Sequence, residues 1–241
     1  MKRTILILLM MLTLAPAALR GQDSESLYQG WGFGFQVGVG GVLPTGSLSD
    51  DFKGCAVFTG GLNAEYDRLR LKADVFYGQP SFKNVNPYAV HDSQGRDLQL
   101  NATANPTLLG VGVQLGCTVW RQGRVSLTPA VGMIAGRLSW DLNHIKYEAD
   151  EEGIERPKID NVTSTHGNLI DWMASVDVDI RLHGKLVDFP SGEDRQGHYV
   201  SSLRISPFVT HAKFNRFYPQ VRGCCFGVTV SYAGLLRAIR K

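Results

Sequence analysis

The histidines are the side chains best suited to acid–base chemistry near neutral pH, and two of them share one segment. His144 and His166 lie in or beside a long stretch that also holds Asp141 and Ser164. A histidine beside a carboxylate and a hydroxyl could accept the proton of a nucleophile. Because spacing within a long loop fixes no geometry, the alternative is that these are ordinary polar loop residues. We expect His211, near the end of a later strand, to be an interfacial residue rather than a base.

Two short segments have part of a ligand-binding pattern. Residues 41–47 have the glycine spacing of a phosphate loop but lack its lysine, so we expect a strand exit there. Residues 150–153 are acidic enough to attract a divalent cation, yet they lack the alternating oxygen ligands of a calcium loop. The sequence therefore predicts neither a cofactor nor a metal site.

The four cysteines have neither CxxC nor metal-ligand spacing. Cys55 and the pair Cys224 and Cys225 fall near the same rim of the predicted structure, on strands that flank the first one. A disulfide could form there if the loops bring the Cα atoms to within about 7 Å. Cys117 is expected to be an outward-facing free thiol.

The chain begins with a segment typical of a secretory signal. Residues 1–21 open with Lys2 and Arg3, continue as an apolar run and end in small residues before Arg20. The alternative is a retained membrane anchor. These three basic residues leave 22 of the 25 in the rest of the chain, against 22 acidic ones. A neutral chain without a basic block argues against nucleic-acid binding.

Eight stretches alternate apolar and polar residues with a period of two, the pattern of β-strands. Most of them have at least the roughly 9 residues that a tilted strand needs to cross a membrane, and helical periodicity is nowhere comparable. The stretches cover residues 31–39, 56–66, 69–77, 109–119, 125–133, 170–182, 203–210 and 226–232. Together they predict an all-β, eight-stranded antiparallel up-and-down transmembrane β-barrel over 31–238, after a short lead at 22–30.

The polar row of these strands is rich in glycine, which decides between two closed architectures. Gly32, Gly34 and Gly38 in the first stretch, and Gly110 and Gly112 in the fourth, all belong to that row. In a soluble ligand-binding barrel this row would face water, where bare glycine has no use. In a membrane barrel it lines a narrow lumen that needs small residues, while the apolar row faces lipid.

Aromatic residues at strand ends fit two interfacial girdles, as expected for a membrane barrel. They are Trp31, Tyr66 and Tyr232 at the periplasmic ends and Tyr77, Trp172 and Phe226 at the opposite ends. The connections agree, because short turns at 67–68 and 121–123 alternate with longer external loops at 46–54, 78–107, 141–168 and 214–223. The turn at 184–197 is longer and predicts a small periplasmic excursion.

Charged residues collect on the face that we expect to line the lumen. They are Glu65, Arg70, Lys72, Asp74, Asp177, Asp179, Arg181 and Arg204. In the hairpin centred on 67–68, Glu65 lies opposite Arg70, and such cross-strand pairs are in direct contact. We therefore predict that these charges plug the lumen. The alternative is a wider, water-filled pore in which they are solvated.

The signal, the glycine-rich first strand at 31–41, its exit at 44–47 and the strand set resemble the porin-like outer-membrane β-barrel proteins of Gram-negative bacteria. The resemblance is to the small OmpA/OmpX-type class. It implies contacts with outer-membrane lipid and lipopolysaccharide, with both termini in the periplasm. Such barrels usually finish on an aromatic residue that the assembly machinery recognises, whereas here Tyr232 is followed by an aliphatic and basic tail.

Three functions remain open at this point. The first is a non-enzymatic outer-membrane barrel that supports the envelope or presents its external loops to a surface ligand or protein. The second is a subunit of an envelope assembly or secretion machine that uses the 184–197 turn as a contact. The third is a lipid A-modifying enzyme at the barrel rim, as the resemblance allows, with His144 or His166 as its base.

Overall fold

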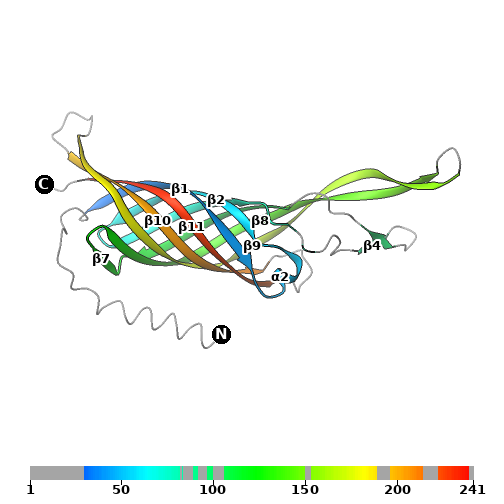
Figure 1. Cartoon of the computed structure of the whole chain (residues 1–241), viewed down its shortest axis with the longest axis horizontal. Helices are drawn as coiled ribbons and strands as arrows, with labels where there is room; N and C mark the ends of the chain where they lie inside the picture. Colours follow the sequence, from blue (N-terminus) through cyan, green and yellow to red (C-terminus); the bar gives the residue numbers. More distant parts are fainter. Residues whose placement is uncertain are drawn as a thin grey trace.

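The computed structural model describes residues 30–81, 83, 89–91, 97–99, 106–149, 153–188, 196–213 and 222–238. The predicted signal at 1–21, and the lead at 22–30 except Gly30, lie outside these residues. No helix in the described ranges is long and apolar enough to cross a membrane. The described chain is almost entirely β-strand (Figure 1).

Eight long strands form the body of the molecule. They are β1 (Trp31–Pro44), β2 (Cys55–Tyr66), β3 (Leu69–Gly78), β6 (Thr107–Cys117), β8 (Val125–Ala149), β9 (Glu155–Asp188), β10 (Gln196–Lys213) and β11 (Arg222–Ala238). The short elements are α2 (Leu48–Asp51), the hairpin of β4 (Ala89–His91) with β5 (Asp97–Gln99), and β7 (Trp120–Gln122).

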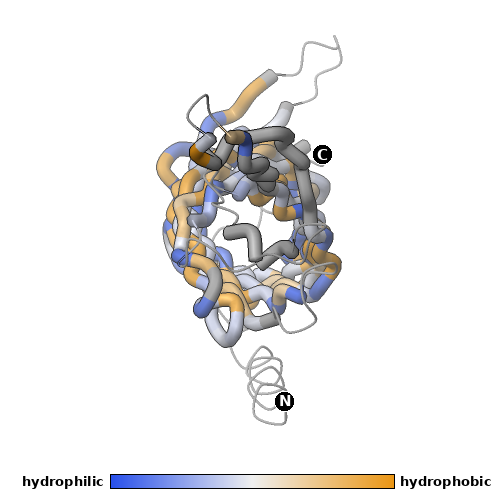
Figure 2. The backbone as a smooth tube through the Cα atoms, turned by 90° about the vertical axis from the view of Figure 1, so that its right-hand side faces the viewer, coloured by the Kyte–Doolittle hydropathy of each residue, from blue (hydrophilic) through white to orange (hydrophobic). Residues whose placement is uncertain are grey.

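The eight strands close into a barrel, which is seen end-on in Figure 2. Each long strand is antiparallel to its neighbours in sequence, and the first and last strands pair from Gly32↔Arg237 to Pro44↔Cys225. Closure leaves no free edge around the barrel. The fold predicted from the sequence, an all-β, eight-stranded, antiparallel up-and-down barrel, is confirmed.

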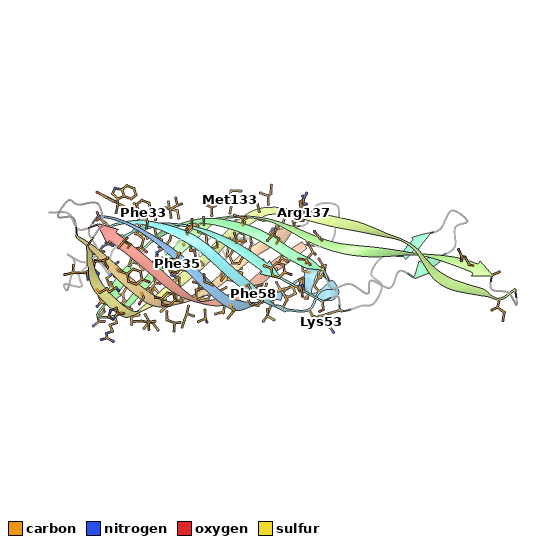
Figure 3. All side chains as sticks on the ribbon, turned by 90° about the horizontal axis from the view of Figure 1, so that it is seen from above. Phe33, Phe35, Lys53, Phe58, Met133 and Arg137 are labelled. Atoms are coloured by element: carbon orange, nitrogen blue, oxygen red, sulfur yellow. The ribbon has the colours of Figure 1, made fainter. Side chains whose placement is uncertain are left out.

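Apolar side chains cover the outside of the barrel and polar ones line the inside. Along β3 the exposed residues alternate strictly with buried ones, so that Leu71 and Tyr77 face outward while Lys72 and Asp74 face inward. Phe33 and Met133 on other strands are 65% and 59% exposed (Figure 3). The polarity of the two faces is therefore the one that the glycine row predicts.

We call the two ends of the barrel the termini end, where β1 begins and β11 finishes, and the arm end. At the arm end β8 and β9 continue past Ser139 and His166 and pair only with each other, up to Ala149↔Glu155. We call this two-stranded extension the arm (Figure 1). The prediction of a loop at 141–168 is wrong. Outside the barrel, a two-stranded ribbon does not need an apolar face. The alternation of apolar and polar residues is therefore lost, although the two strands remain paired.

Two further boundaries differ from the prediction. The excursion expected at 184–197 is strand at both of its ends, because β9 and β10 stay paired as far as Asp188↔Gln196, while residues 189–195 lie outside the described residues. The last strand continues beyond Tyr232 to Ala238, so Tyr232 pairs with Val37 in the middle of β1 and is not at a strand end. The reason is that Arg237 is still inward-facing and buried, which requires the strand to go on.

The segment after β1, predicted as an external loop at 46–54, folds into the arm end of the barrel. Its helix α2 brings Leu48 and the following Phe52 into an apolar cluster, in which they are 2% and 4% exposed. We call this cluster the apolar cap; it consists of Leu48, Phe52, Phe76, Ile134, Leu138, Leu169, Met173, Phe208 and Ala212. The lumen therefore has an apolar half at the arm end and a polar half at the termini end.

Candidate functional site in the lumen

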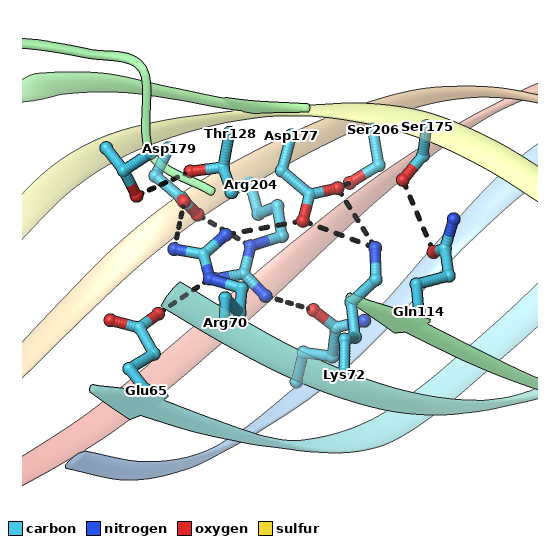
Figure 4. A network of polar contacts seen from close by, with 12 residues as sticks. Glu65, Arg70, Lys72, Gln114, Thr128, Ser175, Asp177, Asp179, Arg204 and Ser206 are labelled. Atoms are coloured by element: carbon cyan, nitrogen blue, oxygen red, sulfur yellow. Dashed lines mark hydrogen bonds and ion pairs between the residues drawn. The ribbon is translucent and has the colours of Figure 1, made fainter. Parts of the chain in front are cut away.

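Seven of the eight charged residues predicted to line the lumen do so and are buried. They are Glu65, Arg70, Lys72, Asp74, Asp177, Asp179 and Arg204. Inward positions on β2, β3, β9 and β10 supply them, two residues apart where they share a strand. Figure 4 shows six of them, all except Asp74, pointing toward one another.

Arg70 is the centre of the cluster. Its Nε lies 2.7 Å from Oε1 of Glu65, the cross-strand partner that the hairpin register predicts. Its Nη2 lies 2.7 Å from Oδ2 of Asp179, and its Nη1 lies 3.3 Å from Oδ2 of Asp177. Because β3 and β9 are not neighbours in the barrel, these last two contacts cross the lumen.

Lys72 occupies the next inward position on β3 and shares the same aspartate. Its Nζ is 3.0 Å from Oδ1 of Asp177 and 3.7 Å from Oδ2 of Asp74. The hydroxyl of Ser206 donates a hydrogen bond to Asp177 at 2.7 Å. Asp177 is fully buried, so each of these donors replaces part of the hydration that its carboxylate loses.

Arg204 connects β10 to its neighbour β9 and to β1, two strands away. Its Nε is 2.6 Å from Oδ1 of Asp179, and its Nη1 donates to Oε1 of Gln36 at 2.5 Å. The amide nitrogen of Gln36 donates in turn to Asp74. Gln36 is not among the residues predicted from the sequence, although it lies in the same polar row of the first strand as the glycines.

Arg237 is the second member of the cluster that is not predicted from the sequence. Its Nη2 is 2.6 Å from Oε2 of Glu65, and its Nη1 donates to the carbonyl of Gly30 at 3.0 Å. The sequence gives only a weak signal for it, because the inward positions between Ser231 and Arg237 hold the apolar Ala233 and Leu235.

With Arg237 included, the charges balance. We call this set the lumenal network: Glu65, Asp74, Asp177 and Asp179 against Arg70, Lys72, Arg204 and Arg237, with Gln36 and Ser206 as neutral members. Burial of a charge is costly unless it is paired and hydrogen-bonded, and every ion of the network has a contact of 3.7 Å or less to an opposite charge. The arrangement is suited to closing the lumen.

Small residues make room for these side chains, as the glycine row predicts. A Cβ added at Gly61 would collide with the carboxylate of Asp74, and one at Gly34 would lie 2.8 Å from Oδ1 of Asn63. The eighth predicted charge, Arg181, is half-buried at the termini end, where its Nη2 donates to the carbonyl of Gly123 at 3.2 Å.

The six predicted girdle residues all lie on the outside of the barrel. Trp31, Tyr66, Tyr77, Trp172, Phe226 and Tyr232 are between 40% and 58% exposed. The rings of Trp31 and Tyr66 are 4.9 Å apart at the termini end. Trp172 lies near the arm end, but Tyr232 is in mid-strand, as described above.

The cysteines are free thiols in the structure, so the rim disulfide considered from the sequence is not formed. Cys55 pairs with Val42 on one side of β1, and Cys225 pairs with Pro44 on its other side. Two strand spacings, roughly 10 Å, therefore separate their backbones. Cys117 is exposed and free, as predicted.

The histidines considered as bases are on strands. His144 pairs with Asn161 and His166 with Ser139, so five residues along β8 separate the two positions, roughly 17 Å. Their side chains lie outside the described residues. His211 instead has a partner that the sequence did not reveal: its Nδ1 is 2.6 Å from Oδ2 of Asp171. The described residues contain no group of three potential ligands placed to hold a metal.

Comparison with known proteins gives a distant likeness. No protein-family model matches the chain, and no curated protein matches it. Among solved structures, the outer membrane protease OmpT from Escherichia coli has 11% sequence identity and a TM-score of 0.38, over 86% of this chain and 95% of that one. A mutant of the TodX monoaromatic hydrocarbon channel has 9% identity and a TM-score of 0.22, over 88% and 72%. At these values neither a family nor an activity is carried over, and the fold rests on the strand register itself.

Proposed function

We propose that this chain spans the outer membrane of a Gram-negative bacterium as a closed, non-enzymatic barrel of the small eight-stranded class. The observation that carries the proposal is that the barrel is apolar on its outside and charged on its inside, the reverse of a water-soluble protein. Large apolar side chains on seven of the eight long strands are exposed, including Phe35, Leu62 and Ile170, while a neutral ion network is buried. Covering this apolar surface with lipid instead of water would be favourable by a free energy of about 25 cal/mol per Å² of surface.

The termini end faces the periplasm in this proposal, and the arm end faces outward. The short hairpin turns at 67–68 and 123–124 lie at the termini end, as is usual for the periplasmic side of such barrels. The arm then extends about ten residue pairs beyond Ser139, roughly 33 Å from the barrel. We propose that it is the surface offered to a ligand or protein outside the cell, with lipopolysaccharide around its base.

The lumen is proposed to be closed, so the protein is not a general porin. The lumenal network blocks one half of the bore and the apolar cap blocks the other. The role that remains is structural support or binding through the arm and the external segments.

The first test is the membrane location. We expect the chain to fractionate with the outer membrane, to need detergent for solubility, and to migrate faster on a gel before boiling than after it, as a closed barrel does. A chain that stays soluble in buffer without detergent and shows no heat-dependent shift would contradict the proposal.

A further inference from the structure

A thiol and a histidine lie next to each other on the outer face of the barrel at the arm end. Cys224 on β11 and His211 on β10 are cross-strand partners, and both are half-buried. The backbone C=O of Cys224 accepts a hydrogen bond from the N–H of Thr45 at 2.8 Å, so it points away from β10. Cys224 and His211 are therefore a non-hydrogen-bonded pair, the closer kind, with Cβ atoms roughly 5 Å apart.

A carboxylate holds the histidine in place from the other side. Nδ1 of His211 lies 2.6 Å from Oδ2 of Asp171, and Oδ1 of Asp171 accepts the backbone N–H of Trp172 at 2.8 Å. The indole of Trp172 is stacked on the imidazole, with 6.5 Å between ring centroids and 12° between the planes. Because Nδ1 is engaged by the carboxylate, Nε2 is the nitrogen that remains for proton transfer.

The order of these groups, thiol, imidazole and carboxylate, is that of an activated cysteine nucleophile. The imidazole accepts the proton of the thiol, and the carboxylate fixes the ring and stabilises the imidazolium that forms. The thiol and Nε2 lie side by side without a hydrogen bond, which is common for a nucleophile and its base before a reactant binds. Cys225, the next residue, instead packs against the apolar cap inside the barrel.

The pair lies where the outer face changes from apolar to charged. Phe226, two residues from Cys224 toward the termini end, is apolar and 53% exposed. Lys213, two residues from His211 toward the arm end, is charged and exposed. In the proposed membrane position this level is the boundary between lipid and water. The side chain of His211 is 33% exposed, so the pair can be reached from the water side.

We propose that Cys224 is a modification site that reacts with a disulfide compound, with His211 as its base and Asp171 as a positioning residue. As His211 takes the proton of the thiol, the sulfur of Cys224 attacks one sulfur of the disulfide R–S–S–R. The old S–S bond breaks, a new one joins Cys224 to one half, and the other half leaves with the proton from His211 as R–SH. The disulfide is the oxidant. The reaction ends at the mixed disulfide, so it modifies the barrel without turnover.

The first test uses the folded wild-type protein in detergent at pH 6.5 with glutathione disulfide, followed by peptide mass spectrometry. Fragmentation of the peptide separates Cys224 from Cys225. We expect the adduct on Cys224 at least about tenfold sooner than on Cys117, although Cys117 is the more exposed thiol. An adduct that forms first on Cys117 would mean that exposure alone decides, and would overturn the proposal.

The second test separates proton transfer from access. It uses Cys55→Ala/Cys117→Ala/Cys225→Ala, which keeps Cys224 alone, and follows the reaction with 2,2′-dithiodipyridine by absorbance from pH 6 to pH 9. Adding His211→Gln should slow the reaction about tenfold near pH 6.5. The difference should shrink toward pH 9, where hydroxide removes the proton in both proteins. A change in access alone would slow the reaction equally at every pH.

Two further variants complete the test. His183→Gln removes a histidine that is exposed at the termini end and should leave the rate unchanged. Asp171→Asn should slow the reaction less than His211→Gln does, because the base remains while its ring is held less firmly. Heat-dependent gel migration checks that each variant is folded.

Equal pH profiles with and without His211 would overturn the proposal. If His211→Gln fails to fold, the adduct experiment on the wild type decides alone. Both measurements use protein in detergent and depend neither on the membrane location nor on the role of the arm. Their failure would therefore leave the proposed function standing.

Discussion

At the scale of single residues, the interior is governed by the cost of burying charge. Asp177 is fully buried and contacts Lys72 and Arg70, while Ser206 donates to it. If its charge is removed, two cations lose a partner in a space that water cannot readily enter. A buried ion pair broken in this way typically costs more than the pair contributed when it was intact.

We therefore expect Asp177→Asn to lower the free energy of unfolding by about 3–5 kcal/mol. Urea unfolding of the protein in lipid vesicles would measure it. Adding Lys72→Met should recover part of the lost free energy of unfolding, because it removes one of the two cations that no longer contact a carboxylate at position 177. Asp50→Asn, at an exposed position, is the control and should change stability by less than about 1 kcal/mol. Equal effects of the two aspartate changes would show that the network does not stabilise the fold.

At the scale of elements, the sequence predicts a strand well where one of its faces is apolar and the other lines the lumen. The alternation in β3 and in the barrel part of β9 gave the right faces and the Glu65↔Arg70 register. The alternation does not predict the strands of the arm, because the two faces of the arm need not differ in polarity. It also missed α2, because Leu48 and Phe52 are two apolar residues in a short loop, and only the closed barrel shows that they meet Phe208 and the rest of the apolar cap.

The arm should be dispensable for folding, since its strands pair only with each other beyond Ser139. Asp141 and Ser164 are cross-strand partners, so residues 142–163 can be replaced by Asn-Gly, which favours a tight hairpin turn. We expect the shortened protein to keep its heat-dependent gel migration. Loss of that shift would mean that the arm helps to close the barrel.

The helix α2 should be held in the barrel mainly by its apolar contacts. Leu48→Ser/Phe52→Ser removes both buried side chains, at a cost of about 2–5 kcal/mol for each large-to-small change. We expect the loop at 46–54 to become open to added protease while the barrel stays folded. Lys53→Ser, in the same loop but exposed, is the control and should leave the loop protected.

At the scale of the whole molecule, the proposed closed lumen has two different barriers, one after the other along the barrel axis. The apolar cap would exclude water at the arm end, and the lumenal network lines the other half with paired charges. Under this proposal, ions must pass both barriers to cross the barrel. Loss of either one alone should therefore leave the lumen closed.

Planar-bilayer recordings can test this arrangement. Arg70→Ala/Asp177→Ala removes one charge of each sign and leaves the pairs Lys72 with Asp74, Arg204 with Asp179 and Arg237 with Glu65. We expect no steady channel from the wild type, from this variant, or from Leu48→Ser/Phe52→Ser. The combination of all four changes should conduct, because it removes part of both barriers. A steady porin-like current from the wild type would mean that the charges are solvated in an open pore, and a current from either double variant would mean that one barrier alone closes the barrel.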